Sequence, residues 1–348
     1  MLAKQSSYKI KITMKKEKTI IIAEAGVNHD GKLNKAFRLA VAAKKTKADY
    51  IKFQAFDPKL LCTVNAAKAD YQKKNTKQES QLNMLKKLSL SKQDINKLNI
   101  FCKKIRIGLM FSVFDSKSYK IINNLKHEYI KIPSGEINNY PLLKSIKKDK
   151  SKIIFSTGLS NLKEIKYCYK ILKEKKNVSK IIIMHCNTEY PTPINDVNLR
   201  VISNLKKIFK CKIGFSDHST STLLPAAAVA LGAKYIEKHF TLNQKSKGPD
   251  HKASLNPKQF SEMVKNINEV EKSLGSNIKK ITNSEKKNLF VVRKSIVAKT
   301  KIFKGEKFNI NNIITKRPGT GISPINWPKI FGRKSKRNYQ EDDLIIYE

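Results

Sequence analysis

The chain has few acidic residues for its length. It carries 28 Asp and Glu against 71 Lys and Arg, which gives a formal net charge of +43 at pH 7 over 348 residues. Such a balance is typical of proteins that bind nucleic acid or an acidic membrane surface. Here the basic residues are spread along the whole chain and are mostly Lys, whereas Arg, the better reader of phosphates and bases, is scarce. We therefore expect no nucleic-acid partner and attribute the Lys, Ile and Asn richness to the coding bias of an AT-rich genome.

Long apolar runs are absent, and cysteines are few. No stretch approaches the roughly 18 apolar residues of a membrane span, so no membrane insertion is expected. Residues 1–18 form a basic extension without the apolar core that a signal peptide needs. The five cysteines are scattered without a CxxC spacing, which indicates reduced thiols and a cytoplasmic protein.

Short apolar runs alternate with amphipathic stretches along residues 19–275. Eight strand–helix units in roughly 260 residues predict an α/β fold with a closed parallel sheet, the (β/α)8 or TIM barrel. A doubly wound open sheet is the alternative, but it normally has fewer strands, and no GxGxxG follows the first run. The eight runs are residues 19–23, 50–53, 107–111, 129–132, 152–155, 180–184, 212–215 and 235–237.

The rest of the chain has a different character. Residues 276–289 are polar and predict a linker, and the weak helical periodicity of residues 290–348 predicts a small β-rich domain. Arg317 stands out in an RPG tripeptide, because Arg is rare in this chain and Pro and Gly fix the loop that carries it. This pattern is equally compatible with an arginine that reaches a substrate and with a surface turn.

Two histidines follow the last two apolar runs. His218 and His239 leave neighbouring parallel strands at the same end, with Glu237 and Asp250 close by in sequence. Imidazole is a common ligand of Mn, Fe and Zn. A lone histidine after a strand is usually structural, but two at equivalent strand ends with carboxylates beside them predict a metal site.

Polar residues also follow the other apolar runs, at the end of the barrel where such folds carry their sites. Lys52 and Lys131 stand inside the apolar runs YIKFQ and YIKIPSG, and Glu24 directly follows the first strand in AEAGVNHDG. A carboxylate there can orient a hydroxyl or move a proton. Ammonium groups and hydroxyls together predict an anion pocket. Its expected members are Lys52, Lys131, Ser134, Ser156, Thr157 and Ser216. The residues alone favour a carbon–carbon condensation between a phosphorylated acid and an aldehyde, alongside aldolase and isomerase chemistry.

Several motifs extend this interpretation. The chain resembles the N-acetylneuraminate (sialic acid) synthases from about residue 19 to 347, in AEAGVNHDG, IKFQAF, KIPSGEINN, MHCNTEYPTP, GFSDHS, IEKHFTL, GPDHKASLNP and KRPGTGISP. Its C-terminal part resembles the antifreeze-like (SAF) domain of that family. The resemblance implies a condensation of phosphoenolpyruvate with N-acetylmannosamine and water, with a divalent metal, Mn first and Mg or Co as alternatives. It also implies a domain-swapped homodimer.

The resemblance assigns expected roles to individual residues. His218 and His239 match the metal ligands, and Arg317 matches an arginine that reaches the sugar N-acetyl group from the partner subunit's small domain. Ser112 stands where many members have Thr and keeps the hydroxyl. The expected phosphoenolpyruvate pocket is Lys52, Ser112, Lys131, Ser134, Ser156, Asn187 and Ser216. The residues expected to hold or activate the sugar and water are Glu24, Tyr190, Glu237 and Asp250, of which Glu24, Glu237 and Asp250 are the catalytic candidates. Gln54, at the end of the second apolar run, is a further expected substrate-binding residue.

Two other functions were weighed against this one. A sibling synthase that makes legionaminic or pseudaminic acid from a diacetamido hexose has the same mechanism, but NTEYPTP and GPDHKASLNP favour the N-acetylneuraminate type. Pocket differences of one or two residues can reverse that preference, because one substituent is worth only about 1–3 kcal/mol. A protein that binds ice or nucleic acid is disfavoured by the Lys-rich small domain and by the polar residues that follow the apolar runs.

Overall fold

The structure is a computed structural model that describes residues 18–76 and 80–347. Residues 1–17, which make up almost all of the expected basic extension, lie outside the described residues. The chain divides into two compact units after Gly275. Each unit is built around its own apolar core.

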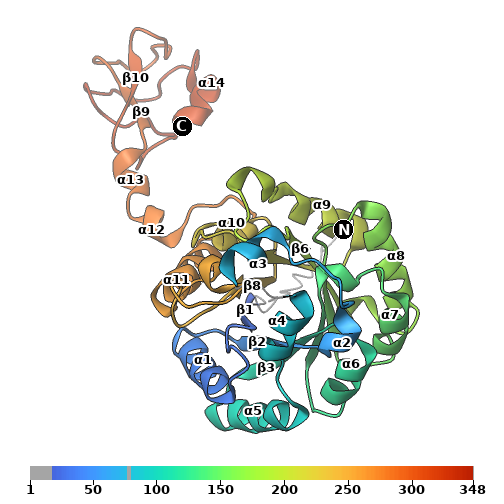
Figure 1. The fold of residues 1–348 in the computed structure, drawn as a ribbon. Helices are drawn as coiled ribbons and strands as arrows, with labels where there is room; N and C mark the ends of the chain where they lie inside the picture. Colours follow the sequence, from blue (N-terminus) through green and yellow to red (C-terminus); the bar gives the residue numbers. More distant parts are fainter. Residues whose placement is uncertain (1–17, 77–79, 348) are drawn as a thin grey trace. The chain divides into compact units, whose positions relative to one another are not determined.

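The first unit is a closed parallel barrel, which confirms the predicted (β/α)8 fold (Figure 1). The strands pair in chain order within the described residues, and β1 closes the ring by pairing with β8. All eight predicted runs fall on these strands. The strands are β1 (Ile20–Gly26), β2 (Tyr50–Ala55), β3 (Gly108–Val113), β4 (Tyr129–Ile132), β5 (Lys152–Ser156), β6 (Ile181–Cys186), β7 (Lys212–Asp217) and β8 (Tyr235–His239).

Amphipathic helices cover the outside of the barrel (Figure 1). Several begin at capping boxes, in which the side chains of Ser91, Asn161 and Asn256 accept backbone N–H groups of the first turn. Their apolar faces pack on the outward side chains of the strands. These helices are α1 (Leu33–Lys45), α5 (Lys92–Ile105), α6 (Ser116–Asn123), α7 (Tyr140–Ile146), α8 (Leu162–Lys173), α9 (Arg200–Phe209), α10 (Leu224–Ala230) and α11 (Pro257–Ser273).

The long connection after β2 lies at the carboxyl end of the barrel. It contains α2 (Pro58–Leu61), α3 (Asp70–Asn75) and α4 (Gln81–Leu88). Helix α4 buries Met84 and Leu88 in a small apolar cluster with Val27 of the β1 loop and Phe56. This cluster fixes the connection beside the mouth of the barrel.

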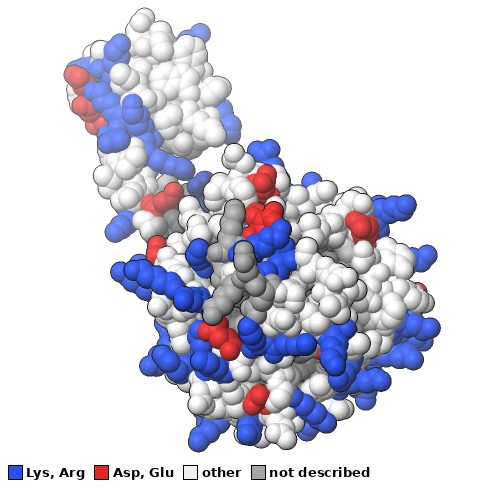
Figure 2. Space-filling view, viewed as in Figure 1, with Lys and Arg blue, Asp and Glu red and all other residues white. Residues whose placement is uncertain are grey.

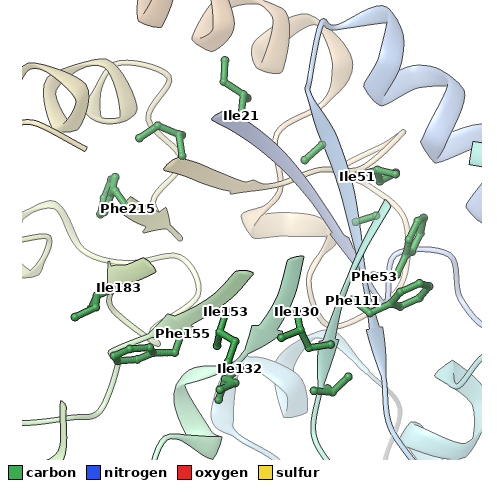
Figure 3. Close-up of a cluster of buried hydrophobic side chains, with 14 of the residues drawn as sticks. Ile21, Ile51, Phe53, Phe111, Ile130, Ile132, Ile153, Phe155, Ile183 and Phe215 are labelled. Carbon is green, nitrogen blue, oxygen red and sulfur yellow. The ribbon is translucent and has the colours of Figure 1, made fainter. Parts of the chain in front are cut away.

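Side chains alternate across the barrel wall, as the period of a strand requires. Figure 3 shows outward residues such as Phe53, Phe111 and Phe155, which form the core between strands and helices. The inward layer at the amino end is apolar and aromatic, and there Tyr129 packs edge-on against both Tyr50 and Tyr235. The buried charged network described below lies at the opposite, carboxyl end of the barrel.

The second unit matches the predicted small β-rich domain. Strands β9 (Ser295–Ala298) and β10 (Ile313–Lys316) pair antiparallel, and isolated bridges such as Ile302 to Tyr339 extend the β structure. Its core includes Phe308, Tyr339 and Ile345. Its helices are α12 (Asn283–Lys286), which lies within the expected linker, α13 (Leu289–Val292) and α14 (Trp327–Ile330).

The surface bears the basic composition without gathering it into one place. Figure 2 shows Lys and Arg side chains distributed over the visible face of the barrel unit, with small acidic groups between them. Among the described residues, no helix combines the length and apolarity needed to cross a membrane.

Candidate active site

A cavity of about 640 Å³ opens at the carboxyl ends of the barrel strands. Its size suits a small organic ligand. It brings together every site residue predicted in the barrel except Thr157 and Asn187. These residues are Glu24, Lys52, Gln54, Ser112, Lys131, Ser134, Ser156, Tyr190, Ser216, His218, Glu237, His239 and Asp250.

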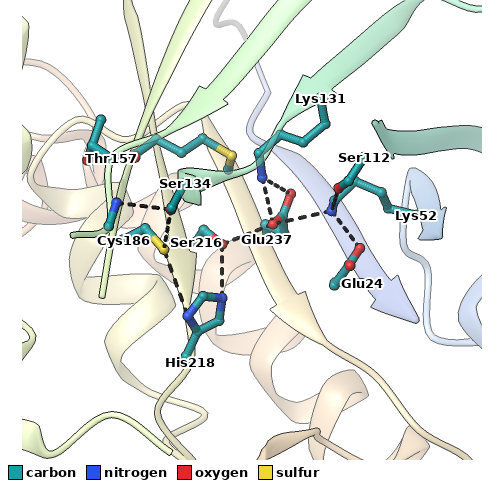
Figure 4. Close-up of polar contacts among 12 residues, drawn as sticks. Glu24, Lys52, Ser112, Lys131, Ser134, Thr157, Cys186, Ser216, His218 and Glu237 are labelled. Carbon is teal, nitrogen blue, oxygen red and sulfur yellow. Dashed lines mark hydrogen bonds and ion pairs between the residues drawn. The ribbon is translucent and has the colours of Figure 1, made fainter. Parts of the chain in front are cut away.

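Four charged side chains form a buried network on the cavity floor (Figure 4). Lys52 Nζ lies 2.7 Å from Glu24 Oε2, and Lys131 Nζ donates to both carboxylate oxygens of Glu237 at 2.8 and 2.9 Å. A 3.6 Å contact between Lys52 and Glu237 joins the two pairs, and none of the four side chains is more than 5% exposed. The sequence predicted an anion pocket at these lysines, and the structure shows that the two glutamates are already their partners.

The serine hydroxyls join this network. Ser112 Oγ accepts a hydrogen bond of 2.6 Å from Lys52, and Ser216 Oγ donates to Glu237 at 2.9 Å. Because β1, β2, β3, β4, β7 and β8 all contribute, the network ties most of the ring together. We refer to Glu24, Lys52, Lys131 and Glu237 as the charged tetrad.

Burial and ion pairing shift the pKa values of the tetrad's side chains in opposite directions. Burial raises the pKa of Glu24 more than Lys52 lowers it. Burial would also raise the pKa of Glu237, but Lys131 and Lys52 outweigh it and hold that pKa well below the ordinary value. For Lys131 burial prevails and lowers the pKa. Glu24 is therefore the carboxyl of the tetrad that takes up a proton most readily.

The two histidines lie side by side on one wall of the cavity. The ring centroids of His218 and His239 are 5.3 Å apart, and Tyr190 stacks on His218 at 4.1 Å. The Tyr190 hydroxyl lies 3.2 Å from Nε2 of His218, whose Nδ1 contacts the carbonyl oxygen of Asn187. Burial, reinforced by the neighbouring His218, lowers the pKa of His239 well below its usual value. The imidazole ring of His239 is therefore neutral and has a nitrogen lone pair that can bind a metal ion.

Apart from Glu24 Oε2, whose partner is the ammonium group of Lys52, two buried polar atoms of the cavity lack a hydrogen-bond partner within the described part of the chain. They are Nδ1 of His239 and the hydroxyl of Ser156. Buried polar atoms normally have partners, so an unpaired one in a cavity marks a place where a ligand is expected. The described residues contain no group of three or more His, Cys, Asp and Glu that could hold a metal ion. A metal at the two histidines would therefore need ligands from substrate or water.

A second carboxyl lies next to Glu24. A Cβ atom on Gly26 would stand 3.3 Å from both Asp250 Oδ2 and Glu24 Oε1, so Gly26 separates the two groups. Gly26 has a φ of +52°, which a residue with a side chain adopts only with strain. Burial, with the charge of Glu24 added, raises the pKa of Asp250 to about 7.

Three predicted residues do not line this cavity. Thr157 donates its hydroxyl to the carbonyl oxygen of Met184 at 3.0 Å. Asn187 uses its side chain to accept the backbone N–H of Glu189 at 2.7 Å and presents only its carbonyl oxygen to His218. Arg317 belongs to the second unit, where it is exposed and its Nε donates to the carbonyl oxygen of Val292 at 3.0 Å.

The cavity also contains residues to which sequence reasoning assigned no role. Glu136 follows β4 and hydrogen-bonds to Asn139, and burial raises its pKa. Its position just after β4 is the same signal that identified Ser134. Asp70 and Gln81 reach the cavity from α3 and α4, and no sequence pattern pointed to them.

The barrel, the strand-end cavity and the small β domain together define a class of two-domain barrel enzyme. The chain belongs to the NeuB family, whose model matches residues 39–279, and the SAF domain model matches residues 293–347.

Individual relatives agree with this family. The chain is 46% identical to the N,N'-diacetyllegionaminic acid synthase of Campylobacter jejuni, over 94% of this chain and 99% of that protein. It is 33% identical to the N-acetylneuraminate-9-phosphate synthase of Homo sapiens, over 94% and 91%. A crystal structure of an N-acetylneuraminic acid (sialic acid) synthetase from Leptospira borgpetersenii in complex with citrate is 32% identical, with a TM-score of 0.71 over 78% of this chain and 90% of that one. The chain is thus a relative of synthases that make sialic-acid-like sugars.

Proposed function

We propose that this protein condenses phosphoenolpyruvate with an N-acetylated amino hexose and water, giving a nine-carbon sugar acid and phosphate. The observation that carries the proposal is the charged tetrad next to a histidine pair in one strand-end cavity of a NeuB-family chain. Such a cavity offers cations for an anionic substrate and carboxyls for proton transfer.

Phosphoenolpyruvate is the proposed ligand of the lysine side of the cavity. Lys52 and Lys131 supply charge and are buried, so their interaction with an anion is weakly screened by water. The unpaired Ser156 hydroxyl is available to a phosphate or carboxylate oxygen. Ser134 and Ser216 also line the cavity, but their hydroxyls already donate to Cys186 and Glu237 and would have to change partner to bind the ligand. Because the lysines are already paired with glutamates, we expect the ligand to share them rather than to displace their partners.

His218 and His239 are the proposed holders of a divalent metal, with Mn²⁺ first and Mg²⁺ or Co²⁺ as alternatives. The neutral His239 ring with its unpaired nitrogen fits a metal ligand. When bound, such an ion supplies Lewis-acid polarisation of the sugar aldehyde.

The chain's own residues account for the proton movements. Carbon 3 of phosphoenolpyruvate attacks the aldehyde carbon, water adds at carbon 2, and the resulting adduct loses phosphate by C–O cleavage. The new alkoxide needs a proton and the attacking water must lose one. Asp250, with a pKa of about 7, can do either near neutral pH, and Glu24 lies beside it to orient the sugar or share the proton.

The amino sugar is proposed to be a 2,4-diacetamido hexose of the legionaminic type. The 46% identity to the Campylobacter jejuni synthase supports this choice against 33% to the human N-acetylneuraminate-9-phosphate synthase. N-acetylmannosamine, which the motifs NTEYPTP and GPDHKASLNP favoured, is the second candidate. Both sugars carry an N-acetyl group and an open-chain aldehyde, so the chemistry of the cavity is the same for each.

We further propose that the working form is a domain-swapped homodimer in the cytoplasm. Arg317 and the largely exposed apolar residues Phe290, Val291 and Val292 lie on the small unit, as expected of a surface that meets a partner subunit. In that arrangement Arg317 would meet the sugar N-acetyl group in the partner's barrel. All five cysteines lie in the described residues as free thiols, which supports a reducing compartment.

Phosphate release from phosphoenolpyruvate tests the function directly. Each candidate sugar is supplied with Mn²⁺ or with excess chelator, and the product is identified by mass. Release with the 2,4-diacetamido hexose that is at least tenfold faster than with N-acetylmannosamine is the expected result. The reverse order would replace the proposed sugar with N-acetylmannosamine, and no release with any aldose would refute the activity.

A further inference from the structure

A second buried ion pair lies outside the cavity, behind the two histidines. Lys238 Nζ on β8 is 2.6 Å from Asp217 Oδ2 on β7, and the side chains are 0% and 1% exposed. The two residues are direct partners in the β7–β8 register. Because side chains alternate across a strand, Ser216 and Glu237 point into the barrel, whereas this pair points outward and is buried beneath the helices.

The pair is linked to both histidines through the backbone. Asp217 immediately precedes His218, and Lys238 immediately precedes His239. Asp217 Oδ1 accepts the backbone N–H of Ser219 at 2.8 Å, and Lys238 donates to the carbonyl oxygen of the same serine. Asp217 and Ser219, the residues on either side of His218, are therefore both bonded to the side chain of Lys238, which immediately precedes His239.

Stability alone does not explain this arrangement. A buried ion pair loses its hydration, and replacing one with apolar residues of similar volume is often neutral or stabilising. Lys238 and Asp217 satisfy each other and Ser219, so neither is left to bind a ligand. What the pair does provide is a directional cross-link between the two strand ends that carry the histidines.

We infer that Asp217 and Lys238 are positioning residues, which hold His218 and His239 at the spacing needed to share one divalent cation. The inference rests on the metal site of the proposed function. Residues that orient metal ligands typically contribute 10- to 100-fold to metal affinity. The pair therefore acts on the metal through His218 and His239 without touching it.

The test is a titration of the full-length protein with Mn²⁺, in which free Mn²⁺ is followed by electron paramagnetic resonance. The double variant Asp217→Leu/Lys238→Met removes the cross-link and leaves no unpaired charge. We expect it to bind Mn²⁺ about 10- to 100-fold more weakly. A matched control, Lys147→Met/Glu174→Leu, removes an ion pair of the same charges from the ends of α7 and α8, and we expect it to bind like the wild type.

Three comparisons separate the ways in which the inference can fail. If His218→Ala binds Mn²⁺ as the wild type does, the proposed metal site is wrong and the positioning role falls with it. If His218→Ala loses binding but the double variant retains wild-type affinity, the positioning role alone is refuted. If Asp217→Leu/Lys238→Met does not fold, Asp217→Asn/Lys238→Met replaces it, because Asn keeps an acceptor for Ser219. Unchanged affinity in that variant also refutes the role, and a loss that the control does not share supports it.

Discussion

Asp250 is expected to reduce the stability of the protein at neutral and alkaline pH. Its carboxyl is fully enclosed in the cavity region next to Glu24, and its pKa is raised from 3.8 to about 7. Burying a charge there costs free energy, because water is replaced by a poorer solvent and by a second acidic group. Asp250→Asn keeps the shape and removes the charge, so we expect this variant to be more stable than the wild type.

The magnitude follows from the two pKa values. The folded-state value lies above the unfolded one, so the contribution of this group to stability is complete below pH 3.8 and is lost as pH rises through 7. A shift of about 3 units at about 1.4 kcal/mol per unit gives a total of about 4 kcal/mol. Between pH 5 and pH 8 the stability advantage of Asp250→Asn should therefore grow by about 2.5 kcal/mol.

Urea denaturation of the ligand-free protein at pH 5, 6, 7 and 8 measures this difference. The exposed Asp196 provides a control, because Asp196→Asn makes the same substitution outside the cavity. The same Asp250→Asn protein should release phosphate at least 100-fold more slowly, because proton transfer by a placed group contributes about 10² to 10⁴ in rate. A stability difference that stays constant from pH 5 to pH 8 would refute the assignment of a buried, proton-binding carboxyl.

The remaining predictions concern the tetrad and its loop. Lys131→Met leaves Glu237 without its closest cation and should lower the free energy of unfolding by about 3–5 kcal/mol; a loss below 1 kcal/mol in urea denaturation would contradict the pairing. Gly26→Ala should destabilise the fold by about 1–2 kcal/mol through its positive φ and also slow phosphate release, because its Cβ enters the site. Gly305→Ala is the control, because Gly305 has a positive φ but open space around it; this variant should lose stability through backbone strain without slowing phosphate release. Glu24→Gln should slow phosphate release by about 100-fold or more, and nearly full turnover would exclude a role in the reaction.

The barrel and most of the site were predictable because both follow from local patterns. Apolar runs identified the strands, and residues that follow most of the runs reached the cavity because parallel strands end at one rim. His218, His239 and Ser156 were found in this way. Asn187 obeys the same rule but fails the prediction, because its side chain turns back to the N–H of Glu189. Local sequence does not encode that choice.

The partners of the lysines were beyond the reach of the sequence. Lys131 is paired with Glu237, which lies 106 positions later in the chain. The two side chains meet only because the sheet closes into a barrel, so that β4 and β8 face each other across its interior. Asp70 and Gln81 reach the cavity only because the connection after β2 folds back over the mouth. Such contacts depend on tertiary structure rather than on spacing.

The balance of charge in the tetrad has a consequence for substrate entry. Two lysines and two glutamates sum to no net charge, so a multiply charged anion that enters the metal-free cavity leaves it negative. The nearby carboxyls with raised pKa values, Glu24 and Asp250, are the groups that respond to such a field. Binding of the anion is then accompanied by uptake of hydrogen ions from solution, and the heat of binding depends on the ionisation enthalpy of the buffer.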